Sequence, residues 1–418
     1  MKTPSMSRAA STLVEKTLLG VKSTAIPGSG PTSTVSVVIR GGSKFESASG
    51  AAHVLERFAF QNTAKRSGLR LTRETELMGG QLSHYHDRES IVLTAKFLRQ
   101  DLPFFVELLG DVVGSPSLDD FELVETVWPL AILESRAADA VPSNTALELA
   151  HSVAFRKGLG NPRLVDPDSD HVSIENVRDH FAATYTKANI HIVGNDVDTE
   201  VFQQLVESAF GSIPEGTAVS APTPAAFHGE ARVKSTAGNA FTLAYPLIGA
   251  DASPAAAVLG YALGGIPAIK WATSSASIPT GAAEVSPFVS TATGYASYAN
   301  AGLLHFSVTG PYSAASSVSA AAKKAASVIK SAPSSLSDDV IKRAIAQAKF
   351  AAASAVDSYE GTNWAVGTKG LGLGSVDTAA FDKVTPDAVK AVAKKIAEAT
   401  PAVAAVGKIF ELPHTDEL

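Results

Sequence analysis

The chain has 418 residues, 45% of them hydrophobic, which exceeds what one core usually organises, so we expect several globular units. Its formal net charge of -6 lacks the basic footprint that nucleic-acid binding needs, which excludes that class of protein. Because the sequence has no cysteine, disulfides, thiolate nucleophiles and cysteine metal sites are excluded, and any metal would need His, Asp or Glu ligands.

The chain begins with a basic segment, residues 1–23, that is rich in serine and threonine. It carries four basic side chains and one acidic one: Lys2, Arg8, Lys16, Lys22 and Glu15. This composition is typical of a mitochondrial transit segment, and an ordinary basic arm is the alternative that composition leaves open. The most apolar window, "ASPAAAVLGYALGGIPAIKW", is interrupted by prolines, glycines and a lysine, so we predict no membrane-spanning helix.

Strand-like and helix-like segments then alternate along the chain. The apolar runs "STVSVVIRGG", "ESIVLTAKFL" and "ANIHIVGN" predict strands, and the longer segments at 100–113, 123–141 and 144–158 predict helices. Alanine-rich segments at 313–332 and 387–399 have high helix propensity. The pattern predicts an α+β fold in which helices pack on a mostly antiparallel sheet.

The sequence nearly repeats itself at an offset of about 210 positions. "KGLG" occurs twice, 212 positions apart, and "VSIENVRDHF" aligns with "VTPDAVKAVA" at the same offset. Upstream, "AAHVL" ending at Leu55 faces "AAAVL" ending at Leu259. This period is too long for a solenoid, so we predict two homologous, superposable lobes, 24–211 and 232–418, joined by a proline-containing linker at 212–231.

One stretch carries the spacing of a metal-dependent active site. In "GAAHVLERFAF", His53, Glu56 and Arg57 share one face of a predicted helix. The inverted zinc signature H-x-x-E-H would place a histidine at the position of Arg57. A guanidinium stays protonated and offers no lone pair to a metal, so the substitution removes one ligand and adds positive charge.

The surrounding residues, "GGSKFESASGAAHVLERFAFQNTAKR", resemble the metal-motif region of the pitrilysin-type peptidases, the insulinase and mitochondrial processing peptidase family. "LMGGQLSHYHDRESIVLTAKFL" resembles the stretch that follows in that family. Glu134 lies 77 positions after Arg57, close to where the family places its distant zinc-binding glutamate. The resemblance spans essentially the whole chain and implies two pitrilysin-type lobes, the first with a degenerate zinc motif.

Losing the second histidine while keeping the fold resembles the non-catalytic core subunits of mitochondrial complex III. That branch implies a peripheral subunit on the matrix side of the inner membrane. Its implied partners are core protein 1, cytochrome b and cytochrome c1 in a dimeric complex. Two lobes of this size with a 45% apolar composition should also bury large apolar surfaces against partners, so we expect the isolated chain to be poorly soluble or self-associating.

Two other functions stay open: a divergent zinc metallopeptidase subunit, and the presequence-binding alpha subunit of the processing peptidase. The latter has a long glycine-rich loop, whereas the corresponding region here, residues 258–281, has only Gly260, Gly264, Gly265 and Gly281. Zinc in the purified protein would favour the metallopeptidase subunit. Binding of basic amphipathic presequence peptides would favour the presequence-binding subunit. We find no phosphate loop and no nucleophile elbow.

We therefore predict no catalytic, metal-binding or cofactor-binding residue and no cofactor. Ala257 and Gly260 stand opposite His53 and Glu56 in the repeat, so the second half supplies no replacement site. His84 and His86 alternate as on a strand, which favours a polar strand over a metal site. Glu134 is either an ordinary surface carboxylate or, as we hypothesise, the partner of Arg57 at the place of the missing metal.

Overall fold

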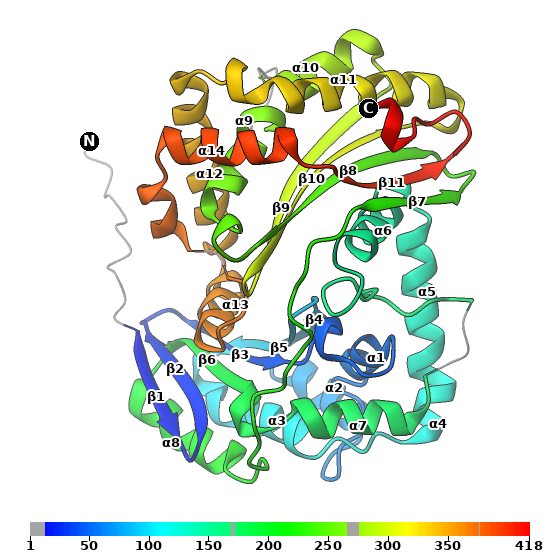
Figure 1. The fold of residues 1–418 in the computed structure, drawn as a ribbon. Coiled ribbons are helices and arrows are strands. Elements are labelled where there is room, and N and C mark those ends of the chain that lie inside the picture. Colours follow the sequence, from blue (N-terminus) through cyan, green and yellow to red (C-terminus); the bar gives the residue numbers. More distant parts are fainter. Residues whose placement is uncertain (1–12, 169–171, 266–275, 376) are drawn as a thin grey trace. The chain divides into compact units, whose positions relative to one another are not determined.

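A computed structural model describes residues 13–168, 172–265, 276–375 and 377–418, and Figure 1 shows its elements. The chain forms two compact units, each assembled from segments that are far apart in the sequence. The first unit contains Met1–Leu130, Asp170–Ser220 and Val356–Leu373, and the second contains Ala131–Ser169, Ala221–Ala355 and Gly374–Leu418.

The first unit is built on a mixed, mostly antiparallel sheet, which we call the first sheet. Its strand order is β1-β2-β6-β3-β5-β4, with β2 and β6 parallel and the other neighbours antiparallel. The strands are β1 (Val14–Leu18), β2 (Val21–Pro27), β3 (Thr32–Arg40), β4 (Gln81–His86), β5 (Ser90–Leu98) and β6 (Ile190–Val197).

Helices cover both faces of the first sheet, which explains why β3 is almost continuously buried. One face packs on α3 and α8, where Phe97 stacks on Phe105 with ring centroids 4.5 Å apart. The other face packs on α13. The helices of this unit are α1 (Ala51–Arg57), α2 (Gly68–Leu77), α3 (Leu102–Gly114), α4 (Asp120–Glu122), α7 (Ile174–Thr184), α8 (Thr199–Phe210) and α13 (Tyr359–Gly370).

The second unit is built on the second sheet, with strand order β7-β11-β8-β10-β9. β7 and β11 are parallel and the other neighbours are antiparallel. Position by position this order matches β2-β6-β3-β5-β4 of the first sheet, as the sequence repeat leads one to expect. That the two lobes superpose stays a prediction. The strands are β7 (Gly229–Lys234), β8 (Asn239–Ile248), β9 (Ser290–Tyr298), β10 (Ala301–Gly310) and β11 (Ala402–Gly407).

The second sheet is also covered on both faces. Leu243 and Phe306 lie in a core with α9, α11 and α14, whereas Ala240 and Ala244 of the opposite face pack on α6. The helices are α6 (Pro142–Phe155), α9 (Pro254–Gly264), α10 (Ser277–Val285), α11 (Ala315–Ser335), α12 (Asp338–Ala355) and α14 (Pro386–Glu398), and α5 (Trp128–Asp139) enters this unit from the first.

The two halves of the sequence exchange helices: α6 and most of α5 belong to the second unit, and α13 belongs to the first. Both copies of "KGLG" follow or end such a helix, the first after α6 and the second at the end of α13. α6 comes from the first half but packs on β8 and β11, and α13 comes from the second half but packs on β3 and β6. The compact units therefore differ from the contiguous segments 24–211 and 232–418 by this exchange.

Specific polar contacts hold α13 on the first sheet. The buried Asn363 amide donates to the Thr34 carbonyl at 3.3 Å and the Ser36 hydroxyl at 3.1 Å. The Tyr359 hydroxyl donates to Asp196 at 2.6 Å. Gly367 lets the helix approach closely, because a Cβ there would lie 2.4 Å from a methyl carbon of Val38. The docking of α13 is therefore specified by both shape and hydrogen bonding.

Two boundaries and the interior of one helix differ from the prediction. The first sheet starts at Val14, within the predicted basic segment, of which residues 1–12 lie outside the described residues. The predicted linker ends in β7, which begins at Gly229. The helix predicted at 123–141 contains a π turn, Leu123–Val127, directly before α5. Pro129 follows this turn and has no N–H to donate to the carbonyl four residues earlier, which explains the local widening.

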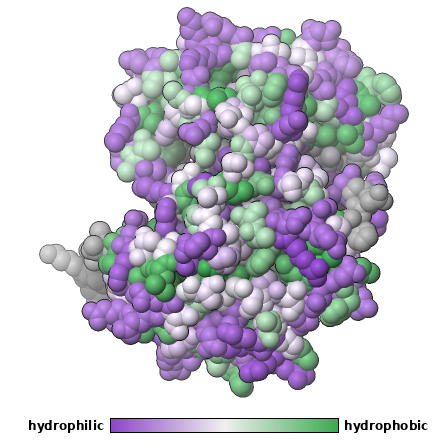
Figure 2. Space-filling model, turned by 60° about the horizontal axis from the view of Figure 1, so that its bottom comes forward, coloured by the Kyte–Doolittle hydropathy of each residue, from purple (hydrophilic) through white to green (hydrophobic). Residues whose placement is uncertain are grey.

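Within the described residues, no helix is long and apolar enough to cross a membrane. Large apolar side chains do reach the surface, among them Leu77, Phe121, Leu133, Phe288 and Phe410. On the face drawn in Figure 2, hydrophobic residues occur in small groups among hydrophilic ones. Self-association through apolar surfaces stays a prediction.

Candidate functional site

The degenerate motif lies on α1 in the first unit. Gly50 adopts a φ of 86°, a left-handed conformation that favours glycine, and the chain turns there into the helix. The Glu46 carboxylate accepts hydrogen bonds from the backbone N–H groups of Gly50 and Ala52 at 3.1 and 3.2 Å. His53 and Glu56 are buried on the resulting helix, at 0% and 1% exposure.

Two histidines from β4 converge on Glu56. His84 Nδ1 is hydrogen-bonded to Glu56 Oε1, and His86 Nδ1 lies 3.4 Å from Glu56 Oε2. Burial alone would raise the pKa of Glu56, but the hydrogen bond with His84 and the close contact with His86 outweigh it and hold that pKa well below its usual range. Glu56 is therefore a buried carboxylate stabilised in its ionised form by β4.

The remaining side chains close this cluster. The His53 ring stacks on the His86 ring with centroids 5.1 Å apart. Tyr185, at the end of α7, is buried nearby, and burial together with the charge of Glu56 raises the pKa of its hydroxyl. Arg57 Nε lies 3.3 Å from Glu56 Oε2, and the Arg57 side chain is 27% exposed. We call His53, Glu56, Arg57, His84 and His86 the Glu56 cluster.

These residues do not fit the zinc ion that the motif would imply. Arg57 stands at a ligand position of the signature and contacts the carboxylate that would activate a metal-bound water. The same carboxylate is engaged by His84 and His86. Across the part of the chain that the structure describes, no three His, Asp or Glu side chains are placed to share a metal ion.

The structure brings together residues that the sequence treated separately. His84 and His86 lie on a polar strand, as predicted, but their contact with Glu56 was not foreseen. Glu56 and Arg57, which are adjacent in the sequence, form an ion pair. The only available signal was the alternation of the two histidines, which places both on one face of β4.

Glu134 lies on α5 and belongs to the second unit, whereas Arg57 belongs to the first. The Arg57–Glu134 pair therefore stays a prediction. In the second half, Ala257 and Gly260 lie on α9 at positions corresponding to His53 and Glu56. Of the predicted glycine-poor region, residues 266–275 lie outside the described residues.

Replacing Arg57 with alanine is expected to lower the free energy of unfolding by about 1 kcal/mol, because partial exposure lets water screen its contact with Glu56. A double-mutant cycle of Arg57→Ala and Glu134→Ala, followed by thermal unfolding, measures whether the two side chains interact. A coupling energy near zero would contradict the pairing with Glu134 and leave Glu56 as the partner.

Glu46 offers a pH-dependent test beside the cluster. Burial raises the pKa of Glu46 to about 7 although two backbone N–H groups oppose the shift. The folded protein then binds more protons than the unfolded chain between pH 4.5 and 7, so stability falls as the pH rises through that window. We expect Glu46→Gln to stabilise the protein by about 2 kcal/mol at pH 8 and not at pH 4.5. Thermal unfolding of wild type and variant at both pH values measures the difference in stability. An equal increase in stability at pH 8 and pH 4.5 would contradict the prediction.

Comparison with known proteins finds a matching family model and similar sequences that cover most of the chain. Residues 25–167 match the family model of insulinase, peptidase family M16. The mitochondrial cytochrome b-c1 complex subunit 2 of Yarrowia lipolytica is 39% identical over 96% of this chain and 95% of its own length. The corresponding subunit of Cryptococcus neoformans is 36% identical over 96% and 93%. The alpha subunit of the mitochondrial-processing peptidase of Solanum tuberosum is 28% identical over 50% and 42%.

Proposed function

Because this chain belongs to the family of the mitochondrial cytochrome b-c1 complex subunit 2, a branch related to the M16 peptidases, we propose that it is a structural core subunit of complex III. In this role it supports assembly and stability of the ubiquinol:cytochrome c oxidoreductase and carries out neither redox nor peptidase chemistry. The observation that best supports the proposed lack of peptidase chemistry is the ion pair of Arg57 with Glu56.

The contacts of Glu56 support the proposed absence of peptidase chemistry. A zinc peptidase needs a carboxylate that is available to take a proton from a metal-bound water. Here the carboxylate is held ionised by two imidazoles and lies beside a guanidinium. A dication at this place would be repelled by Arg57 and would have to displace the histidines from Glu56. The cluster supports a structural role on these grounds.

The proposed partners are core protein 1, cytochrome b and cytochrome c1, in a dimeric complex. The proposed location is the matrix side of the inner mitochondrial membrane, with peripheral attachment. The names of the relatives support a mitochondrial complex III subunit. The peripheral attachment is supported by the described helices, of which none could span a bilayer.

Affinity purification of the tagged full chain from mitochondria tests the proposal. We expect haem-containing subunits to copurify, with an absorbance spectrum of b- and c-type cytochromes, and no stoichiometric zinc by elemental analysis. A variant whose tag is cleaved before capture provides the matched background. Copurification of a processing peptidase partner without haem would favour the presequence-binding alternative, and one zinc per chain would favour the metallopeptidase alternative.

A further inference from the structure

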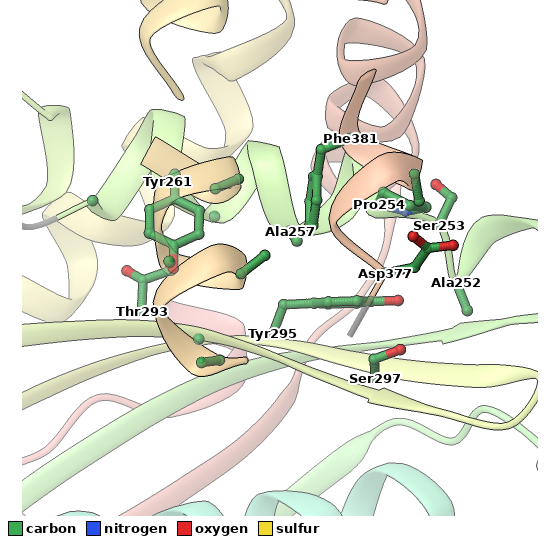
Figure 3. Close-up of a pocket in the computed structure, with 18 of the residues that line it drawn as sticks. Ala252, Ser253, Pro254, Ala257, Tyr261, Thr293, Tyr295, Ser297, Asp377 and Phe381 are labelled. Carbon is green, nitrogen blue, oxygen red and sulfur yellow. The ribbon is translucent and has the colours of Figure 1, made fainter. Parts of the chain in front are cut away.

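The second unit contains a cavity of about 410 Å³ beside its edge strand, β9. The described residues around it come from α9, β9, α12 and a segment that leads into a 3-10 turn, Thr378–Lys383 (Figure 3). Its volume lies in the range of small-molecule sites, roughly 300–1,000 Å³. The function proposed above rests on no residue of this cavity.

The cavity exists because α9 presents small side chains where its counterpart presents large ones. In the first unit, Glu56 reaches from α1 to the histidines of β4. In the second unit, two glycines let α9 lie close to the sheet: a Cβ at Gly260 would lie 3.1 Å from a methyl carbon of Leu304, and one at Gly264 would lie 1.8 Å from the Thr293 hydroxyl oxygen. The facing wall, on α12, is also small: Ala348, Ala351, Ala352 and Ala355. The helix therefore approaches β9 closely and still leaves a hollow beside it.

Three aromatic rings from three different elements line this hollow. They are Tyr261 of α9, Tyr295 of β9 and Phe381 of the 3-10 turn. In Figure 3, Tyr295 extends along β9 beneath Ala257, and Phe381 lies above. Tyr295 can lie flat because the neighbouring strand has Gly302, where a Cβ would be 2.2 Å from the Tyr295 hydroxyl oxygen. The rings and the alanines together suit a flat apolar group.

The cavity also contains polar atoms that lack a protein partner. The hydroxyl oxygens of Thr293 and Tyr295 are buried, and neither has a hydrogen-bond partner among the described residues. Burial raises the pKa of Tyr295 to about 12, so its hydroxyl is a neutral donor at physiological pH. Buried hydroxyls are normally paired, so two unpaired ones on residues that line the cavity suit a ligand with a polar group.

The polar residues at one end of the cavity indicate which kind of ligand would fit. Ser253, Ser297 and Asp377 lie at one end of the cavity, whereas Tyr261 and Thr293 lie at the other (Figure 3). Asp377 is the only charged side chain among the described lining residues. It is oriented by a hydrogen bond from the Ala379 backbone N–H at 3.0 Å. A ligand with a positive charge near this carboxylate and an apolar body inside would match the cavity.

We propose that this cavity is a binding site for a small aromatic amine, with the ring between Tyr261, Tyr295 and Phe381 and the ammonium group at Asp377. The inference is independent of the proposed role in complex III. It identifies the ligand by its shape and charge: one ring, a short linker and a cationic nitrogen.

Phenethylamine is the probe, and calorimetric titration of the folded full chain is the measurement. For a ligand of this size we expect a dissociation constant on the order of 1 mM. 2-Phenylethanol has the same ring without the charge, and 3-phenylpropionate has the opposite charge. We expect the amine to bind about threefold more tightly than the alcohol, since an exposed carboxylate contributes modestly, and the carboxylate ligand to bind most weakly.

Two variants locate the site. Ala257→Leu fills the hollow and should weaken phenethylamine binding at least about tenfold. Asp377→Asn keeps the acceptor for the Ala379 N–H and should remove the preference for the amine over the alcohol. The matched control is Asp382→Asn in the same turn, which removes a surface partner of Lys349 and should change neither ligand's affinity.

Circular dichroism establishes whether each variant is folded. If Ala257→Leu does not fold, Ala351→Leu on the facing wall is used in its place. The proposal is overturned if phenethylamine does not bind the folded wild-type chain, or if binding is unchanged in the filled variant. Equal affinity for the amine and the anionic ligand would overturn the assignment to cations. Loss of the preference in Asp377→Asn alone, with retention in Asp382→Asn, supports it.

Discussion

Glu56→Gln is expected to lower the free energy of unfolding of the first unit by about 3 kcal/mol at pH 7. The neutral amide removes the negative charge that two histidines and Arg57 face, and breaking a buried charged network is typically this costly. The pKa of Glu56 lies below its value in the unfolded chain, so its contribution is fully present above pH 4.5 and decreases as the pH falls. Thermal unfolding between pH 4 and 8 measures this dependence.

Glu46→Gln provides the opposite control for this experiment. It replaces another largely buried glutamate in the segment before the same helix, but there burial raises the pKa. The two variants should therefore differ in sign at pH 8 and converge toward wild-type behaviour in acid. If Glu56→Gln lowers the free energy of unfolding by the same amount at every pH, the shape of the side chain and not its charge determines stability at this position.

Gly367→Ala is expected to destabilise the first unit by about 3 kcal/mol, although Gly367 belongs to the second half of the sequence. The new Cβ would lie 2.4 Å from a methyl carbon of Val38 in β3, and overpacking at such a contact typically costs about 1–3 kcal/mol. For a unit of this size that corresponds to a fall in melting temperature of roughly 6–12 °C. Hydrogen exchange of the β3 and β6 amides should accelerate.

The matched control is Gly114→Ala at the end of α3, where a Cβ would meet no atom within 4 Å. We expect a change within about 0.5 kcal/mol there. If both substitutions change the stability equally, Gly367 is not required for the close approach of α13 to β3. If exchange accelerates only in α13 itself, the helix does not stabilise the sheet beneath it.

Periodicity and repetition were sufficient to predict most of the fold. The buried runs in β3, β5 and β6 and the alanine-rich helices α11 and α14 were readable because burial and helix propensity are local properties. The π turn before α5 was not predicted, since a proline near a helix start is also compatible with an undisturbed helix.

The Glu56 cluster was only partly predictable. The spacing of His53, Glu56 and Arg57 follows from helix geometry, which the sequence determines directly. The meeting of Glu56 with His84 depends on how β4 docks against α1, and 28 positions separate the two residues in the chain. The cavity beside β9 was likewise invisible, because the small side chains of α9 and α12 form a hollow only once the two helices are placed beside each other.

The exchange of α6 and α13 has a consequence for how the protein is made. The first unit contains Val356–Leu373, so one face of its sheet stays bare until nearly the whole chain has been synthesised or imported. The hydrogen bond between Asn363 and Thr34 closes a separation of 329 positions, which is slow and costly in chain entropy. During that interval Val38 and Val92, which later pack on Leu371, are exposed apolar surface on a sheet. The segment synthesised first thus completes its native packing among the last, and a nascent chain has a long period in which a chaperone can bind it.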